Sequence, residues 1–235
     1  MGTTYNTAIV RDGLVLHLDA ANRKSYPGSG TVWKDLSGLG NNGTLINGVG
    51  YSADNNGSMV FDGVNDQVTI SHSSLLAPTS SITLSSWVDT NWQTTNSVRI
   101  LSKTEGGGWQ LAINDDPAGS RVGMTIHIGG SYRYATVPKS TISSGYHNIV
   151  GTFDGRLMKL HIDASPVVSI DLGSTLSLTY ILNNALVIGA EAGASGPANT
   201  NFINAKISNV QIYNRALSPL EIQQNFEATR GRYGI

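Results

Sequence analysis

The chain has 235 residues, a formal net charge of −1 and 13 % charged residues, against roughly a quarter in ordinary soluble domains. It lacks the clustered excess of Lys and Arg that nucleic-acid binding requires, so we expect no nucleic-acid partner. The absence of cysteine excludes a disulfide framework, a thiolate nucleophile and a zinc knuckle. Ser, Thr, Asn and 27 Gly carry the polarity instead, which suits many strands joined by tight turns.

The N-terminal residues carry neither the basic region nor the apolar core of a signal peptide, so we expect no leader of that kind. No stretch approaches the roughly 18 apolar residues of a membrane span, and we expect no membrane contact. The chain also contains no linker, charge run or break in composition. We therefore predict a single domain over residues 1–235.

The first predicted strand is Gly13–Leu18, a nearly continuous apolar run. His17 lies inside this run, where a lone histidine is more often a hydrogen-bonded core residue than a ligand. A loop dense in turn-forming residues then leads to Trp33. Asp35 opens a second loop, rich in Gly and Asn, whose carbonyls and carboxylate we expect to point inward.

The segment Ser58–Ile70 is predicted to be a hairpin, because two short apolar stretches flank a bend of turn-forming residues. This arrangement holds Asp62 and Asp66 close together. Two neighbouring carboxylates repel each other unless a cation or hydrogen-bond donors lie between them. The sequence leaves two interpretations open: a hard-metal site, or carboxylates that cap backbone N–H groups of the turn.

Strands recur at short intervals after this bend, and three of them show a clear period of two: Ile82, Leu84 and Val88; Val122, Met124, Ile126 and Ile128; and Met158, Leu160 and Ile162. Further strands are expected at Val98–Lys103, Trp109–Asn114, Tyr132–Val137, His147–Asp154, Val167–Asp171, Leu186–Ala190 and Lys206–Tyr213. About a dozen strands in one domain predict an all-β fold, a two-sheet antiparallel jelly-roll sandwich.

One short C-terminal helix is expected. Ser218, Pro219 and Glu221 together form the pattern of a capping box with proline at the first helical position. Leu220, Ile222 and Phe226 would supply an apolar stripe that docks on the sandwich. The tail from Arg230 to Ile235 has no fixed type, and we expect it to be exposed or to engage a neighbouring molecule.

Six motifs, in order, resemble the laminin-G-like branch of the concanavalin A-like lectin/glucanase superfamily. They are Trp33–Leu45, Phe61–Asp66, Ile82–Val88, Tyr146–Gly155, Leu160–Asp163 and Ile207–Ser218. The resemblance covers nearly the whole chain and is specific for the fold but not for a function. It implies that Asp35, Asp62 and Asp66 lie on one rim, where relatives often hold calcium, so one structural calcium ion is expected there. Ser208 and Asn209 stand where many relatives carry an acidic residue, which reduces the charge available.

Catalytic patterns are missing. An enzyme of this superfamily would resemble a glucanase that carries Glu and Asp two residues apart on one strand. No such run occurs in this sequence. There is no Gly-x-Ser-x-Gly elbow, no His-Glu-x-x-His and no phosphate-binding glycine loop. The five histidines (residues 17, 72, 127, 147 and 161) are scattered, and a structural role is favoured for them. We therefore expect a protein that is not an enzyme.

Aromatic residues outside the framework are the candidate ligand contacts. Trp33, Trp87 and Trp109 stand where relatives carry core aromatics, whereas Trp92 lies in a polar loop between two strands. Tyr132 and Tyr134 form a second candidate patch. Such rings can stack on a sugar, anchor a protein interface or fold back on their own loop, and the sequence leaves these uses open.

Leu18-Asp-Ala20, the helix that starts at Ser218 and the ending at Arg230–Ile235 are similar to virion surface proteins of tailed phages. The resemblance implies a non-catalytic structural or binding module of a virion, a decoration, fibre or adhesin protein that contacts glycans, a host surface or other virion proteins. A homo-oligomer is expected. The alternatives are a carbohydrate-binding module of a secreted or envelope protein, which would be extracellular, and a divergent glycoside hydrolase or lyase.

Overall fold

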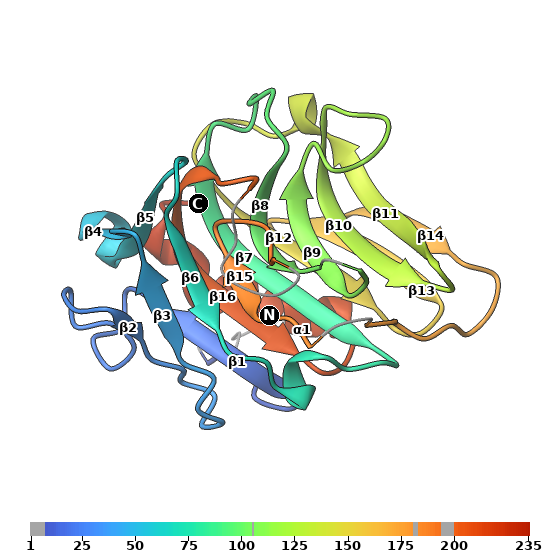
Figure 1. The fold of residues 1–235 in the computed structure, drawn as a ribbon, viewed down its shortest axis with the longest axis horizontal. Coiled ribbons are helices and arrows are strands. Elements are labelled where there is room, and N and C mark those ends of the chain that lie inside the picture. The colour runs from blue at the N-terminus through green and yellow to red at the C-terminus, as the bar shows by residue number, and fades with distance from the viewer. Residues whose placement is uncertain (1–7, 105, 181–182, 194–199) are drawn as a thin grey trace, which may run out of the picture.

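The structure, a computed structural model, describes residues 8–104, 106–180, 183–193 and 200–235. Two antiparallel β-sheets face each other, and one short helix follows the last strand (Figure 1). The predicted all-β sandwich with a C-terminal helix is confirmed. The described part of the chain holds no helix with the length and hydropathy needed to cross a bilayer.

Sheet A comprises, in spatial order, β14 (Ser165–Asp171), β13 (Leu157–Ile162), β12 (Tyr146–Phe153), β7 (Ile82–Thr90), β16 (Asn204–Tyr213), β5 (Ser58–Asp62) and β4 (Gly50–Ser52), with β1 (Leu14–Asp19) also paired to β16. Sheet B comprises β11 (Ser131–Pro138), β10 (Arg121–Ile128), β9 (Trp109–Ile113), β8 (Val98–Lys103), β15 (Leu186–Ile188), β6 (Gln67–Ile70), β3 (Gly43–Ile46) and β2 (Val32–Trp33). The described residues also form short 3₁₀ helices between or after these strands: η1 (Asp54–Asn56), η2 (Ser74–Leu76), η3 (Lys139–Thr141) and η4 (Arg230–Arg232).

The core lies between the two sheets and follows the period of two in the sequence. Alternate residues of β7 and β10 are buried in one continuous apolar cluster, among them Leu84, Met124 and Ile126. Their neighbours in sequence point to the outer faces of the sandwich, since successive side chains of a strand alternate. Trp33 and Trp109 are also buried in this core, as expected from the sequence.

The predicted hairpin at Ser58–Ile70 is wrong. β5 pairs with β4 and β16 in sheet A, whereas β6 pairs with β3 and β15 in sheet B. The bend between them carries the chain from one sheet to the other. Phe61 and Val68 therefore enter the same core from opposite sheets. A hairpin and a crossing bend need the same turn-forming residues, so the local pattern could not tell them apart.

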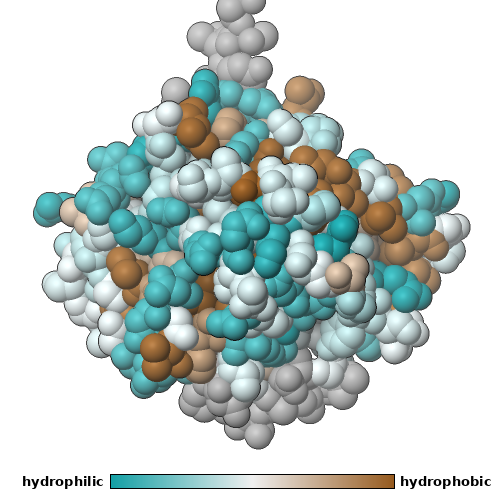
Figure 2. Space-filling view, turned by 90° about the horizontal axis from the view of Figure 1, so that it is seen from above, coloured by the Kyte–Doolittle hydropathy of each residue, from teal (hydrophilic) through white to brown (hydrophobic). Residues whose placement is uncertain are grey.

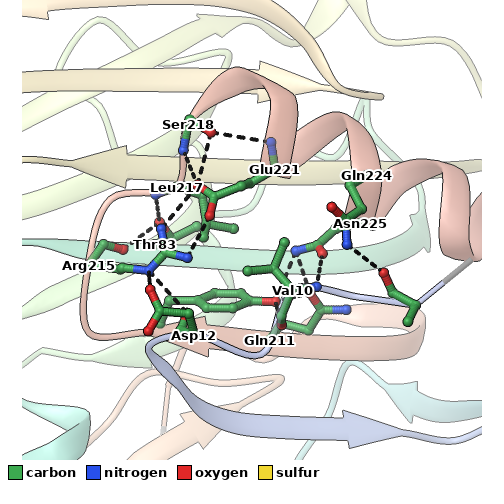
Figure 3. Close-up of polar contacts among 12 residues, drawn as sticks. Val10, Asp12, Thr83, Gln211, Arg215, Leu217, Ser218, Glu221, Gln224 and Asn225 are labelled. Atoms are coloured by element: carbon green, nitrogen blue, oxygen red, sulfur yellow. Dashed lines mark hydrogen bonds and ion pairs between the residues drawn. The ribbon is translucent and has the colours of Figure 1, made fainter. Parts of the chain in front are cut away.

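Helix α1 (Pro219–Thr229) begins at the predicted capping box. The side chain of Ser218 accepts from the backbone N–H of Glu221, and the Glu221 carboxylate accepts from the N–H of Ser218 (Figure 3). Arg215 Nη2 lies 2.6 Å from Glu221 Oε1, which ties the end of β16 to the first turn. Ile222 and Phe226 are buried, but Leu220 is 81 % exposed, so the expected apolar stripe is wrong at that residue.

The tail after α1 packs on the chain's own sheet A rather than standing free. The ring of Tyr233 stacks on Trp87 at 4.1 Å and lies 4.7 Å from Tyr146 between centroids. Arg232 Nη1 lies 2.7 Å from Oδ1 of Asp19, a buried carboxylate at the end of β1. The expectation of an exposed tail available to neighbours is therefore wrong for these residues.

Candidate binding site

Three segments from distant parts of the sequence meet at one end of the sandwich, at the top of Figure 1: the bend after β5, the loop between β7 and β8, and the start of β16. The sheet register brings them together, because Asp62 pairs with Asn204 and Thr90 pairs with Ala205. Gly63 has a φ of +79°, and a Cβ there would lie 3.0 Å from Cβ of Asn204. The close approach of the bend to β16 thus depends on a glycine.

Two adjoining cavities open on this rim. The first has a volume of about 450 Å³ and is lined by Asp62, Gly63, Thr90, Asn91, Thr94, Asn96, Val98, Phe202, Ile203 and Asn204. The second, of about 260 Å³, is lined by Val60, Asp89, Thr90, Asn91, Asn204, Ala205 and Lys206. Thr90, Asn91 and Asn204 belong to both. In the view from above, hydrophilic residues gather across the middle of this face (Figure 2).

Polar contacts fix the loop that forms one wall of the first cavity. Asn114 Nδ2 donates to the carbonyl of Thr94 at 2.8 Å and to that of Asn96 at 2.9 Å. The Thr90 hydroxyl donates to the carbonyl of Asn204 at 2.6 Å. The side chain of Asn96 is exposed and, among the described residues, makes no hydrogen bond, so its amide is available to a ligand.

Asp62 carries the charge of the first cavity. Its Oδ1 accepts from the backbone N–H of Val64 at 2.8 Å and from that of Asn65 at 3.3 Å. These bonds, chiefly the one from Val64, lower the pKa of the Asp62 carboxyl below its usual value. The cavity therefore presents a carboxylate at neutral pH, which repels anionic ligands.

The lining has the chemistry that suits a hydroxyl-rich, uncharged ligand. Asn, Asp and Thr side chains offer donors and acceptors, while Phe202 and Val98 offer apolar surface. The volume lies within the range of about 300–1,000 Å³ that is usual for small-molecule sites. Sugars combine hydroxyl groups with apolar ring faces, so one or two sugar units fit this description.

Trp92, predicted as an exposed ligand contact, is instead 2 % exposed and part of the core. Its Nε1 donates to the carbonyl of Gly145 at 3.1 Å, and its ring meets His147 edge-on at 5.7 Å. The predicted loop is therefore at the rim, but its tryptophan faces inward and its asparagines face the cavity. The ring is too large to be left in water when a neighbouring loop can cover it.

Tyr132 and Tyr134, the second predicted patch, lie on the edge strand β11 of sheet B and belong to neither rim cavity. Tyr132 is 36 % exposed, and its ring meets His127 edge-on at 4.8 Å. Tyr134 is half-buried, and burial, with a contribution from Asp115, raises the pKa of its phenol. Their role in binding stays a prediction.

The predicted metal site at Asp35, Asp62 and Asp66 does not form as one site. Asp35 accepts from the backbone N–H of His17, which pairs with Gln211 far along β16. Asp62 pairs with Asn204, the first residue of that strand. Asn204 and Gln211 are seven residues apart, so at roughly 3.3 Å per residue Asp35 and Asp62 lie about 23 Å apart along β16. The resemblance misled here because it gave the order of the motifs and not their register.

The carboxylate of Asp35 is occupied by its own loop. It accepts from the N–H groups of Ser37 and Asn41 and from the Ser37 hydroxyl. The capping interpretation offered for the bend holds for Asp62, which accepts from the N–H groups of Val64 and Asn65. Asp66 accepts from the N–H of Asp62, and its Oδ1 is buried without a partner. In the described ranges no three His, Asp or Glu side chains are grouped to hold a metal ion. Calcium at Asp62 and Asp66 alone stays a prediction.

The chain spans about half the length of the solved structures that it resembles. The receptor-binding domain of botulinum neurotoxin C/D mosaic serotype aligns with a TM-score of 0.69 at 15 % identity, over 93 % of this chain and 52 % of that one. The binding domain of Paraclostridial Mosquitocidal Protein 1 gives 0.68 at 16 % identity, over 92 % and 52 %. The binding domain of botulinum neurotoxin DC in complex with rat synaptotagmin II gives 0.70 at 13 %, over 94 % and 52 %. At these identities the likeness establishes the fold alone.

Sequence comparison gives the family. No curated protein matches the chain. A laminin-G family model, described as the concanavalin A-like lectin/glucanases superfamily, matches residues 62–223, which is more than half of the chain and includes the rim segments of β5, β7 and β16. The chain therefore belongs to the laminin-G branch of the concanavalin A-like lectin/glucanase superfamily.

Proposed function

We propose that the protein is a binding module whose rim cavities take a neutral glycan. The observation that carries the proposal is the first rim cavity, which places Asn, Asp and Thr side chains around one apolar wall. Asp62 is the one charged residue among the described lining of the first cavity and disfavours sialic or uronic acids there. The adjoining cavity holds one negative residue, Asp89, and one positive residue, Lys206. Because the two cavities share three residues, a chain of two or three sugar units would occupy both.

Two structural neighbours bear names consistent with this proposal. One describes cell entry of botulinum neurotoxin type C that depends on interaction with two ganglioside molecules, and another is a complex with rat synaptotagmin II. Those ligands belong to those proteins. They support the proposal only as a likeness, since this chain covers 52 % of each of those chains.

The test is binding to an array of neutral and acidic glycans, followed by titration of the best ligand against two variants. Asp62→Asn keeps the Oδ1 acceptor for the bend but removes the charge, and Asn96→Ala removes a free amide from the cavity wall. Each change should weaken binding about 5- to 10-fold, which corresponds to about 1 kcal/mol for one hydrogen bond.

Asn65→Ala is the matched control, since Asn65 lies exposed in the same bend and outside both cavities. It should leave binding unchanged. Affinity that is insensitive to Asp62→Asn and Asn96→Ala, or a ligand set made only of acidic sugars, would contradict the assignment of the rim.

We further propose that this module is displayed on a virion surface as a homo-oligomer. The support is the resemblance of Leu18–Ala20 and of the segments after Ser218 to virion surface proteins of tailed phages. Several copies would also multiply the avidity for a weakly bound glycan. Mass spectrometry of purified particles separates this role from that of a carbohydrate-binding module of a secreted or envelope protein, and light scattering gives the number of copies.

A further inference from the structure

A second group of polar side chains lies at the same end of the sandwich but outside both rim cavities. Ser143 belongs to the connection between η3 and β12, His147 is the second residue of β12, and Asp163 lies in the tight turn between β13 and β14. The pairing of β12 with β13 brings that turn beside the start of β12, where Asp163 N–H donates to the carbonyl of Asn148 at 2.9 Å.

The three side chains form a continuous hydrogen-bonded series. His147 Nδ1 lies 2.6 Å from Asp163 Oδ2, and His147 Nε2 lies 3.0 Å from the hydroxyl of Ser143. With the ring proton on Nδ1, the imidazole donates to Asp163 and accepts from Ser143. This is the order of hydroxyl, base and orienting carboxylate that activates a serine nucleophile, and it is recognised by geometry rather than by sequence motif.

The base and the carboxylate are held from several sides. Asp163 Oδ1 accepts from the backbone N–H of Asn148 at 2.8 Å, so both carboxylate oxygens are engaged. The Trp92 ring packs against the imidazole in a T-shaped arrangement, with 5.7 Å between ring centroids. His147 is half-buried while Ser143 is exposed. The catalytic geometry therefore does not depend on a bound ligand, and the hydroxyl is open to one.

Backbone donors stand next to the nucleophile. In the described part of the chain, the N–H groups of Ser144 and Gly145 donate to no protein acceptor, and Gly145 has a φ of +99°. Amides directly after a nucleophilic serine are one of the usual sources of the donors that stabilise an oxyanion. Free N–H groups at this position would donate hydrogen bonds to the negative charge that develops on the carbonyl oxygen of an ester under attack.

We propose that Ser143, His147 and Asp163 form an acyl-transfer site that hydrolyses esters of short acyl groups. Ser143 Oγ attacks the carbonyl carbon, and its proton passes to His147 Nε2. The bond to the alcohol breaks, and the alcohol leaves with that proton. Water then attacks the acyl-serine, His147 takes a proton from the water and returns it to Ser143, and the carboxylic acid departs. Ester and water give acid and alcohol, and no other reactant is needed.

The substrate class follows from the surroundings. Ser143 is exposed and lines neither rim cavity, so a long acyl chain bound there would have no wall of these two cavities to pack against. Asp163 and Asp89 are the charged groups acting on His147, so an anionic acyl group would be repelled. A short uncharged acyl ester of an accessible alcohol is the chemistry that fits.

The pH dependence has a definite sign. The hydrogen bond to Asp163 raises the pKa of His147 above its ordinary value of 6.5. When protonated, Nε2 carries a hydrogen and can only donate, and the Ser143 carbonyl at 3.2 Å is then its acceptor. A protonated imidazole cannot accept the hydroxyl proton, so reactivity should be low in acid and rise with a midpoint above pH 6.5.

The experiment uses the full chain and a fluorophosphonate probe, with peptide mass spectrometry to locate the adduct. The probe should label Ser143, with loss of fluoride, and p-nitrophenyl acetate should be hydrolysed with the same pH midpoint. Ser143→Ala should abolish labelling and that hydrolysis. Ser140→Ala, at an exposed serine of η3 to which no catalytic role is assigned, is the control that should retain both.

Asp163 is a positioning residue, and Asp163→Asn keeps an Oδ1 acceptor for Asn148. It should slow labelling at least about 100-fold, the usual worth of a positioned general base, and move the pH midpoint downward because the raising carboxylate is gone. A loss of packing alone would not move the midpoint. Thermal melts establish that each variant is folded. Wild-type protein that leaves Ser143 unlabelled at pH 8–9, or labelling unaffected by Asp163→Asn, would overturn the proposal.

Discussion

Arg99 is the side chain on which two loops at the rim depend. It is buried at the start of β8, with Nη2 2.8 Å from Asp115 Oδ1 and 3.3 Å from Glu191 Oε2. Its backbone N–H also donates to the carbonyl of Asn201 at 3.1 Å. One guanidinium thus joins the β9–β10 loop to the segment that leads into β16 and carries Phe202 of the cavity wall.

We expect Arg99→Ala to lower the free energy of unfolding by about 3–5 kcal/mol, because it leaves two largely buried carboxylates facing each other without a cation. Chemical denaturation measures the change. Arg156→Ala is the matched control, since Arg156 pairs with Asp171 on the surface, and it should leave the melting temperature almost unchanged. Equal effects of the two substitutions would contradict the role given to Arg99.

At the scale of residues, the sequence predicts the polar loop that lines the first rim cavity but not which of its side chains face that cavity. The sequence predicts a polar loop around Trp92 and points to the large ring as the ligand contact. The structure buries that ring against Gly145 and His147, whose positions depend on a strand about fifty residues later. The exposed Asn91 and Asn96 were in the same segment. Which of them faces outward is a property of packing and not of local composition.

At the scale of elements, the C-terminal tail completes the outer layer of sheet A. Tyr233 covers Trp87 and Tyr146, while Arg232 is the ion partner of the buried Asp19. The sequence predicted helix α1 by its capping box, because a cap is decided by residues three apart. It could not predict the docking of the tail, whose partners lie in β1, β7 and β12.

Truncation after Thr229 should therefore destabilise the fold, by about 3–5 kcal/mol from the unpaired Asp19 together with the lost ring stacking. Truncation after Tyr233 is the matched control, since it removes only Gly234 and Ile235 and keeps both contacts. Thermal melts of the two proteins should differ by many degrees. A shorter chain as stable as the longer one would show that the tail contacts contribute nothing.

The bend after β5, which carries the chain from sheet A to sheet B, shows that local sequence predicts strands but not their partners. The two strands, their apolar faces and the turn residues were all predicted, and only their pairing was wrong. Pairing depends on which distant strand lies alongside, here β16 for β5 and β3 for β6, and the period of two is the same in either sheet. The register of the strands was also missing from the resemblance that grouped Asp35 with Asp62, and in the structure Asp35 lies far along β16 from Asp62.

At the scale of the whole molecule, the question is whether two carboxylates are free to cleave a glycosidic bond. The described carboxylates beside Arg99 and Arg121 are already paired: Asp115 and Glu191 with Arg99, and Asp116 with Arg121 at 3.4 Å. Each rim cavity has one carboxylate among its described lining residues, Asp62 in the first and Asp89 in the second. The backbone hydrogen bonds that lower the pKa of Asp62 make it a poor proton donor. Glycoside cleavage needs an acid and a second carboxylate about 5–9.5 Å apart, both free to act.

We therefore expect no cleavage of glycosidic bonds, even in glycans that the rim binds. Incubation with β-glucans, alginate and agar should produce no new reducing ends and no unsaturated sugar products, while a known glucanase and a known alginate lyase serve as positive controls. This expectation is independent of ester hydrolysis at Ser143, which leaves every glycosidic bond intact. Asp62→Asn and Asp89→Asn make the assay decisive, since turnover at the rim would fall with one of them, whereas a contaminating enzyme would copurify with both variants. Turnover that a single one of these substitutions abolishes would identify a hydrolase or lyase and refute the non-catalytic assignment of the glycan site.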